Sequence, residues 1–245
     1  AAPLGPVGPG VVEATFYNFH PARVRRALPD AWAYATPAVV LDTRAAAAAA
    51  ALRRLLPDGE AERLAAATVA LLAAAVDGAE AAGRPLFAAN REVPRPDDPV
   101  ADLWQLATTL REHRGDGHVA LLTGAGLDGC EVHVLVAACE GTDPDLFLLS
   151  RGWSRDEWGG AQLRLAARGL VTVDGSVTAA GQALRGEIER RTDELAIVPY
   201  AGLGAGEVER LVGMLGPAAG RVATAGEVTY PNPMGLPRPA VVPPR

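Results

Sequence analysis

Apolar residues recur at intervals of three and four along most of this 245-residue chain, a spacing typical of amphipathic helices. Only one short stretch, residues 170–178, has the alternation and turn residues of a strand pair. Helices are predicted, in chain order, over 11–19, 22–28, 37–56, 60–82, 100–113, 118–123, 127–139, 142–149, 154–168, 178–195 and 207–222.

The proline-rich segment 93–99 is the best candidate for a linker. It separates a predicted helical N-terminal domain, residues 1–92, from a second domain, residues 100–225. Residues 226–245 form a tail with too many prolines for regular structure. The predicted fold class is therefore mainly α, a helical N-terminal domain followed by a winged helix-turn-helix with a short β-hairpin.

The winged helix-turn-helix is predicted from helix-end signals within residues 142–195. The first helix of the motif breaks at 150–152, where a Ser-Arg-Gly sequence interrupts the apolar pattern. A capping box follows, in which Ser154 and Glu157 satisfy each other's backbone N–H groups. It begins a second helix that Gly169 stops.

The wing is predicted over residues 170–178. Its Asp174-Gly175 pair suits a two-residue type I′ turn. Thr178 is then placed to cap a long helix, because its hydroxyl can accept from the free N–H groups of the first turn. This order of elements is the layout of a DNA-reading domain.

The run Leu110–His118 (LREHRGDGH) predicts a break between two helices. Two glycines flank Asp116, a favourable N-cap residue, so we expect a turn over 114–117 with Asp116 capping the next helix. His113 would end one helix and His118 would begin the next, so both could face a common space beside the turn.

Composition favours a protein of the reducing cytoplasm. The formal net charge is −6 and every basic residue is arginine, so any contact with DNA needs a local basic patch. Two cysteines are too few for a disulfide framework. No signal peptide and no apolar run long enough for a bilayer are found, so no membrane association is expected.

In a winged helix-turn-helix the second helix enters the major groove, which here is the helix 154–168. Asp156, Glu157 and the Gly159-Gly160 pair disfavour tight binding, because the acids repel phosphate and the glycines weaken the helix. The alternative is a packing module whose core includes Trp153, Trp158, Leu163 and Leu165. The candidate DNA-binding residues are Arg151, Arg155, Gln162, Arg164 and Arg168.

Charged residues and histidines gather in two segments of otherwise apolar helical sequence, around 111–118 and around 16–20. They suit a pocket for a small polar or anionic ligand, or else a solvated salt-bridge network. Cys130 and His133 have metal-ligand spacing on one helical face, so a metal or haem site is an open alternative, although no cofactor is firmly implied. The candidate ligand-binding residues are Phe16, Tyr17, His20, Arg111, His113, Arg114, Asp116, His118 and His133.

Residues 168–195 (RGLVTVDGSVTAAGQALRGEIERRTDEL) and 203–222 (LGAGEVERLVGMLGPAAGRV) resemble the C-terminal half of MarR-like winged-helix proteins. That resemblance implies a homodimer built by the terminal helices. The chain as a whole is similar to a group of actinobacterial helix-turn-helix proteins of mostly unknown function, through 3–32 (PLGPVGPGVVEATFYNFHPARVRRALPDAW), 110–118 (LREHRGDGH) and 230–239 (YPNPMGLPRP).

Two functional hypotheses follow. The first is a cytoplasmic, dimeric transcriptional regulator that binds double-stranded DNA and responds to a small-molecule effector. The second is a protein that does not bind DNA, either a small-molecule-binding protein or an enzyme of specialised metabolism that uses its histidines. Phosphate-loop, dinucleotide-binding and nucleophile-elbow motifs are absent from the sequence, so nucleotide-dependent and serine-hydrolase classes are disfavoured.

Overall fold

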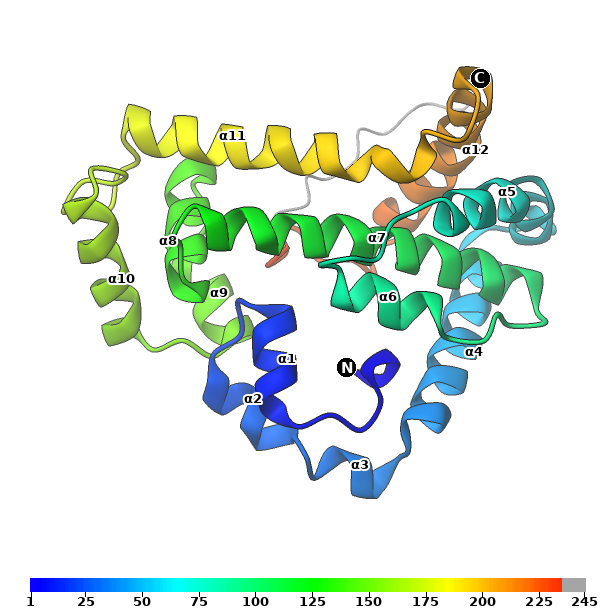
Figure 1. Cartoon of the computed structure of the whole chain (residues 1–245), viewed down its shortest axis with the longest axis horizontal. Coiled ribbons are helices and arrows are strands. Elements are labelled where there is room, and N and C mark those ends of the chain that lie inside the picture. The colour runs from blue at the N-terminus through cyan, green and yellow to red at the C-terminus, as the bar shows by residue number, and fades with distance from the viewer. Residues whose placement is uncertain (235–245) are drawn as a thin grey trace.

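The computed structural model describes residues 1–234, and these residues form a mainly helical fold (Figure 1). The α-helices are α1 (Pro9–Phe16), α2 (Pro21–Ala27), α3 (Ala31–Tyr34), α4 (Pro37–Leu55), α5 (Glu60–Asp77), α6 (Pro85–Arg91), α7 (Pro99–Gly124), α8 (Gly129–Glu140), α9 (Pro144–Arg151), α10 (Arg155–Ala167), α11 (Ala179–Ala196) and α12 (Ala205–Thr224), with short 3-10 helices η1 (Ala2–Leu4) and η2 (Val198–Tyr200).

Helix α7 runs through the centre of the molecule, with α11 lying along it and α6 packed on another side (Figure 1). It is continuous from Pro99 to Gly124, so the predicted break at 114–117 is wrong. The physical reason is tertiary. The Asp116 carboxylate, expected to cap a helix of its own, instead accepts a hydrogen bond from the backbone N–H of Phe87 (2.8 Å) in the first turn of α6. The glycines therefore lie inside a helix that other elements hold in place.

Two hydrophobic cores share α7. The first contains α4, α5, α6, the first half of α7 and parts of α12, whereas the second contains the last turns of α7 with α8, α9, α10 and α11. The proline-rich segment before α7 is fastened at both sides, because Arg53 pairs with Asp98 (2.7 Å) and Arg95 pairs with Asp102 (2.5 Å). The domain boundary at 93–99 stays a prediction.

The first 36 residues form an arm that arches from η1 through α1, α2 and α3 into α4 (Figure 1). A small core of Val12, Val24 and Leu28 holds this arm together, with Phe16 and Trp32 packed against it. Prolines begin α1 and α2, where a missing N–H costs nothing. We call residues 1–36 the N-terminal arm.

Several predicted helix boundaries are confirmed and others are wrong. Helix α4 spans the predicted range to within a residue, and the capping box of Ser154 and Glu157 begins α10. Helix α5 ends near Gly78 rather than at Gly83, and α6 was not predicted at all. The tail has neither helix nor strand over 226–234, as predicted, and its residues 235–245 lie outside the described part of the chain.

The predicted β-hairpin is replaced by a loop. Within residues 1–234 the only β-pairing is an isolated antiparallel bridge between Val171 and Val177, with no strand on either side. The turn is not type I′ either, since only Gly175 (φ +90°) has a positive φ there and Asp174 does not. A three-residue loop with its glycine at the left-handed position fits these dihedrals. We call residues 170–178 the wing loop.

Candidate nucleic-acid interface and adjoining pocket

The helix-turn-helix is formed by α9, the turn at Gly152–Ser154 and α10. Gly152 ends α9 with a φ of +87°, a conformation that favours glycine. Phe147 of α9 stacks on Trp158 of α10 at a centroid distance of 6.2 Å, and both side chains are buried. This stacking links the two helices, but α10 packs mainly on α8, which fixes its position.

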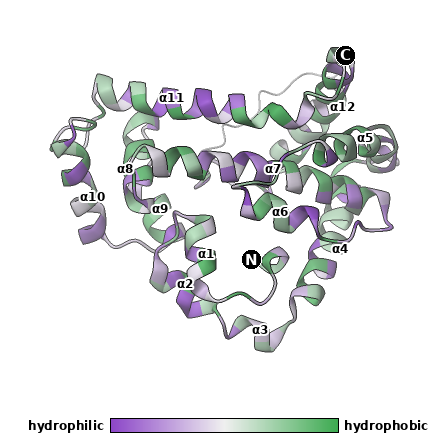
Figure 2. Ribbon diagram, in the orientation of Figure 1, coloured by the Kyte–Doolittle hydropathy of each residue, from purple (hydrophilic) through white to green (hydrophobic). Residues whose placement is uncertain are grey.

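The buried face of α10 consists of Trp158, Ala161 and Leu165. Leu163, expected in this core, is 59% exposed and points away from it. Along the outward face the sequence supplies no basic residue; it runs through Asp156, Gly159, Leu163 and Ala167. Figure 2 shows hydrophilic residues at the start of α10, which include the acidic pair Asp156 and Glu157.

Two of the predicted DNA-binding arginines form ion pairs at the flanks of α10. Arg155 pairs with Asp145 (2.7 Å), and both side chains are largely exposed. Arg164 pairs with Asp128 (2.5 Å) and with Glu131 (2.8 Å), whose carboxylate is buried. Arg155 can exchange its partner for a phosphate at little cost, whereas Arg164 neutralises a buried charge.

The other three predicted DNA-binding residues hold neighbouring elements together. Gln162 donates to the carbonyl of Val173 in the wing loop (2.8 Å). Arg168 donates to two carbonyls at the end of α7, those of Ala125 (2.8 Å) and Gly126 (2.7 Å).

Arg151 lies over the ring of Phe19 at 4.6 Å and donates to the Pro233 carbonyl (2.9 Å). Burial lowers the pKa of its guanidinium. Across residues 143–178 four arginines face four aspartates and one glutamate, so the surface has no excess of positive charge. The local charge therefore provides little electrostatic attraction for DNA phosphate.

Helix α2 supplies a cation that sequence reasoning missed. The Arg23 side chain lies against the turn between α9 and α10, where a Cβ added at Gly152 would lie 3.2 Å from it. The Arg23 guanidinium also donates to the Leu149 carbonyl (3.4 Å). Nothing local in the sequence signals this contact, because Arg23 and Gly152 are far apart in the chain.

Four of the five predicted ligand-binding residues on α7 contact α6 or α11. His113 is 1% exposed and meets the Phe87 ring edge-on at 5.0 Å. Burial, aided by Arg84, lowers its pKa to about 4. Asp116 caps α6, and burial raises the pKa of its carboxyl.

The α11 side of α7 is held by polar contacts. Arg114 pairs with Glu189 (2.9 Å) and with Asp193 (3.2 Å), and the His118 Nδ1 lies 2.9 Å from the Thr192 hydroxyl oxygen. Arg111 pairs with its neighbour Glu112 (2.8 Å). We call the contacts of residues 113–118 with α6 and α11 the α7 junction.

Residues 16–18 of the N-terminal arm pack within the arm and dock it on the start of α8 and on the helix-turn-helix turn. The Tyr17 hydroxyl donates to the Leu127 carbonyl, and Phe16 packs in the core of the arm. The Asn18 carbonyl accepts a hydrogen bond from the Trp153 indole N–H (3.0 Å) and lies 3.2 Å from the His133 Nε2.

His20 bridges α2 and α10. Its Nδ1 caps α2 by accepting from the backbone N–H of Ala22 (3.1 Å), and its Nε2 lies 2.8 Å from the carboxylate of Glu157. Its own backbone N–H donates to the Arg151 carbonyl (3.0 Å). The N-terminal arm is thus bound to the first turn of α10 and to the end of α9.

The four histidines contact different partners. His133 stacks on Phe147 at 4.6 Å, and burial lowers its pKa to about 4. Among the described residues no group of three or more His, Cys, Asp or Glu side chains could hold a metal ion. Cys130 is a buried thiol whose pKa burial raises to about 12, so it is a poor metal ligand and nucleophile.

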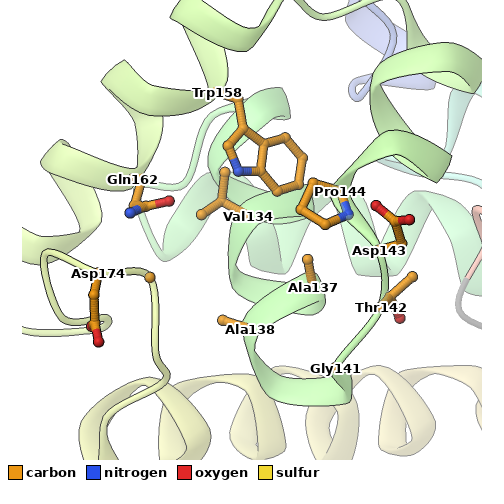
Figure 3. Close-up of a pocket in the computed structure, with 11 residues that line it drawn as sticks. Val134, Ala137, Ala138, Gly141, Thr142, Asp143, Pro144, Trp158, Gln162 and Asp174 are labelled. Carbon is orange, nitrogen blue, oxygen red and sulfur yellow. The ribbon is translucent and has the colours of Figure 1, made fainter.

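A pocket of about 450 Å³ lies between α8, the α8–α9 loop, α10 and the wing loop (Figure 3). It includes none of the residues predicted to bind a ligand and only one predicted to bind DNA, Gln162. Its lining residues come from separate segments of the chain, so no motif in the sequence marks it. It is lined by Val134, Ala137, Ala138, Gly141, Thr142, Asp143, Pro144, Trp158, Gln162, Asp174 and Gly175.

Comparison with known proteins identifies the class. The profile of a helix-turn-helix family matches residues 1–229, so the chain belongs to that family. No curated protein and no solved structure matches the chain significantly. Within the described residues no single helix is long and apolar enough to cross a membrane, although α7 and α8, bent by 97°, meet the length and composition test as a pair.

Proposed function

We propose that this protein is a transcriptional regulator that binds double-stranded DNA through α9 and α10, acts as a MarR-like homodimer and responds to a small-molecule effector. The observation that carries the proposal is the α9–turn–α10 unit, with α10 capped and packed as a separate outer helix, in a chain of a helix-turn-helix family.

The N-terminal arm supplies a route by which an effector could act on α10. Its contacts through Asn18 and His20 reach α8, the end of α9 and the start of α10. A ligand that binds one placement of these elements more tightly than another would shift the population of DNA-competent dimers. That coupling is a thermodynamic requirement of any effector-controlled regulator.

The first experiment is fluorescence anisotropy with duplex DNA from the region upstream of the protein's own gene, against a scrambled duplex, at two salt concentrations. We expect preferential binding that weakens as salt rises, because phosphate contacts release counterions. Arg155→Ala should weaken binding about tenfold, since Arg155 is the predicted reader with only an exposed partner.

The matched control is Arg54→Ala, which removes another exposed, ion-paired arginine, on α4. It should leave the affinity for DNA unchanged. Equal loss in both variants, or no preference for the upstream duplex at low salt, would contradict the proposal.

A second candidate is a small-molecule-binding protein that does not bind DNA. It is favoured by the outward face of α10, which lacks a basic residue, and by the internal partners of all five predicted DNA-binding residues. The enzymatic form of this candidate needs histidines that act together, and their separate partners do not support it. Absence of DNA binding at low salt favours this candidate.

A further inference from the structure

The pocket between α10 and the wing loop has the size and composition of a small-molecule site. Its volume of about 450 Å³ falls in the range of ordinary ligand pockets, roughly 300–1,000 Å³. Val134, Ala137 and Ala138 of α8 form one wall, and the Trp158 ring of α10 lies opposite, as Figure 3 shows. An apolar body of moderate size therefore fits between the two helices.

The polar groups of the pocket are acidic at both ends. Asp143 lies at one end and Asp174 at the other in Figure 3, and none of the lining residues within the described range 1–234 is basic. Hydrogen bonds from the Thr172 hydroxyl and the Ser176 backbone lower the pKa of Asp174, so its carboxylate is charged at neutral pH. An anionic ligand would be repelled there, and a cation would be attracted.

Trp158 supplies an aromatic wall to the pocket. The residue is only 8% exposed, and it lines the pocket from α10. The same ring offers its π face to a cation or to an aromatic group.

We propose that this pocket binds a small organic cation, an ammonium group on an apolar or aromatic body, and that this ligand is the effector of the regulator. The assignment of effector rests on the proposed function; the binding site itself does not. The ammonium group pairs with Asp143 or Asp174, and the body lies against Trp158 and the alanines of α8.

The position of the pocket explains how occupancy would reach the DNA-binding helix. Gln162 of α10 donates to the Val173 carbonyl of the wing loop at the edge of the pocket, and this hydrogen bond links the two elements. A ligand in contact with α8, α10 and the wing loop changes the free energy of their relative placement, so it must change DNA affinity if that placement differs between the free and DNA-bound states.

The test is isothermal titration calorimetry of the whole protein, without DNA, with phenethylammonium and with phenylacetate as probes. These probes share an aromatic body and differ in charge. We expect phenethylammonium to bind in the millimolar range or tighter and phenylacetate not to bind. Ala138→Leu, which fills the pocket, should abolish binding of phenethylammonium.

The acidic ends are tested with Asp143→Asn and Asp174→Asn. At least one of the two should weaken phenethylammonium binding by about fivefold, the size of an exposed ion pair, and Asp30→Asn on the N-terminal arm should have no effect. Circular dichroism confirms that each variant is folded. Equal binding of both probes, binding unaffected by Ala138→Leu, or no binding of phenethylammonium at millimolar concentration overturns the proposal.

The effector role is measured separately, by anisotropy with the upstream duplex in the presence of phenethylammonium. If the protein binds the amine but no DNA, the pocket stands and the regulator proposal fails. If it binds DNA but no amine, the regulator stands and the pocket assignment fails.

Discussion

The α7 junction and the α10 pocket differ in what surrounds their polar groups. Along the junction Asp116, His113 and Arg114 are dense in the sequence, and each meets a group of the same chain on α6 or α11. In the pocket the polar groups are few and come from separate elements, with unfilled space between them.

In this protein, a high local density of charged residues in a helical sequence marks a contact between helices. Residues three and four apart on α7 face α6 or α11 together, so their polar groups find partners on the neighbouring helix. A ligand site needs the opposite arrangement, in which packing leaves a concave space lined by a few polar groups.

The strongest predicted effect is a loss of folding stability at acidic pH. His113 has its pKa lowered to about 4 in the fold, against 6.5 as the ordinary value, so the unfolded chain takes up a proton between these pH values and the folded chain does not. The free energy of unfolding should therefore fall as pH drops from about 6.5 to about 4, by at most about 1.4 kcal/mol per pH unit for this group.

His113→Leu removes that contribution, so chemical denaturation over this pH range should give a flatter dependence than the native protein. His133, whose pKa burial also lowers to about 4, keeps its own contribution in both proteins. No histidine lines the pocket, so its occupancy should not follow this titration. Identical pH slopes for the two proteins would show that His113 is not buried in its neutral form.

A smaller effect distinguishes a carboxylate of the α7 junction from one of the pocket. Asp116→Ala leaves the Phe87 backbone N–H buried without an acceptor, which should lower the free energy of unfolding by about 1–3 kcal/mol. Asp116→Asn keeps an acceptor and should recover much of this loss. Asp143→Asn, in the pocket, should change stability by less than about 0.5 kcal/mol because asparagine caps a helix equally well. Urea denaturation measures the free energy of unfolding of the three variants. Similar losses for Asp116→Ala and Asp143→Asn would contradict the proposed difference between the two carboxylates.

The smallest effect compares two glycines inside helices. A Cβ at Gly159 of α10 meets nothing within 4 Å, so Gly159→Ala should stabilise the protein by about 0.5–1 kcal/mol. A Cβ at Gly117 of α7 would lie 2.8 Å from the Arg84 guanidinium, which donates to the His113 carbonyl. Gly117→Ala should therefore give no such gain. Thermal unfolding of the pair checks this, and a stabilising Gly117→Ala would mean that the Arg84 contact is dispensable.

The helices of the DNA-binding unit could be predicted because their signals are local. Ser154 and Glu157 cap α10 across three residues, Thr178 caps α11 in the same way, and Asp128 caps α8. Hydrogen bonds of this range depend little on the rest of the fold. The candidate site was not predictable to the same degree, because the partners of Arg151, Arg164 and His20 are distant in the chain.

By itself, the sequence determined the helical class, most helix boundaries and the order of a helix-turn-helix, since periodicity and capping act within a few residues. Only the tertiary structure decided that Arg114–Gly117 stays helical, that the wing is a loop with one β-bridge, and that a pocket opens beside Trp158. The physical reason is that these outcomes depend on packing between distant segments, which can override local preference and which no single stretch of sequence encodes.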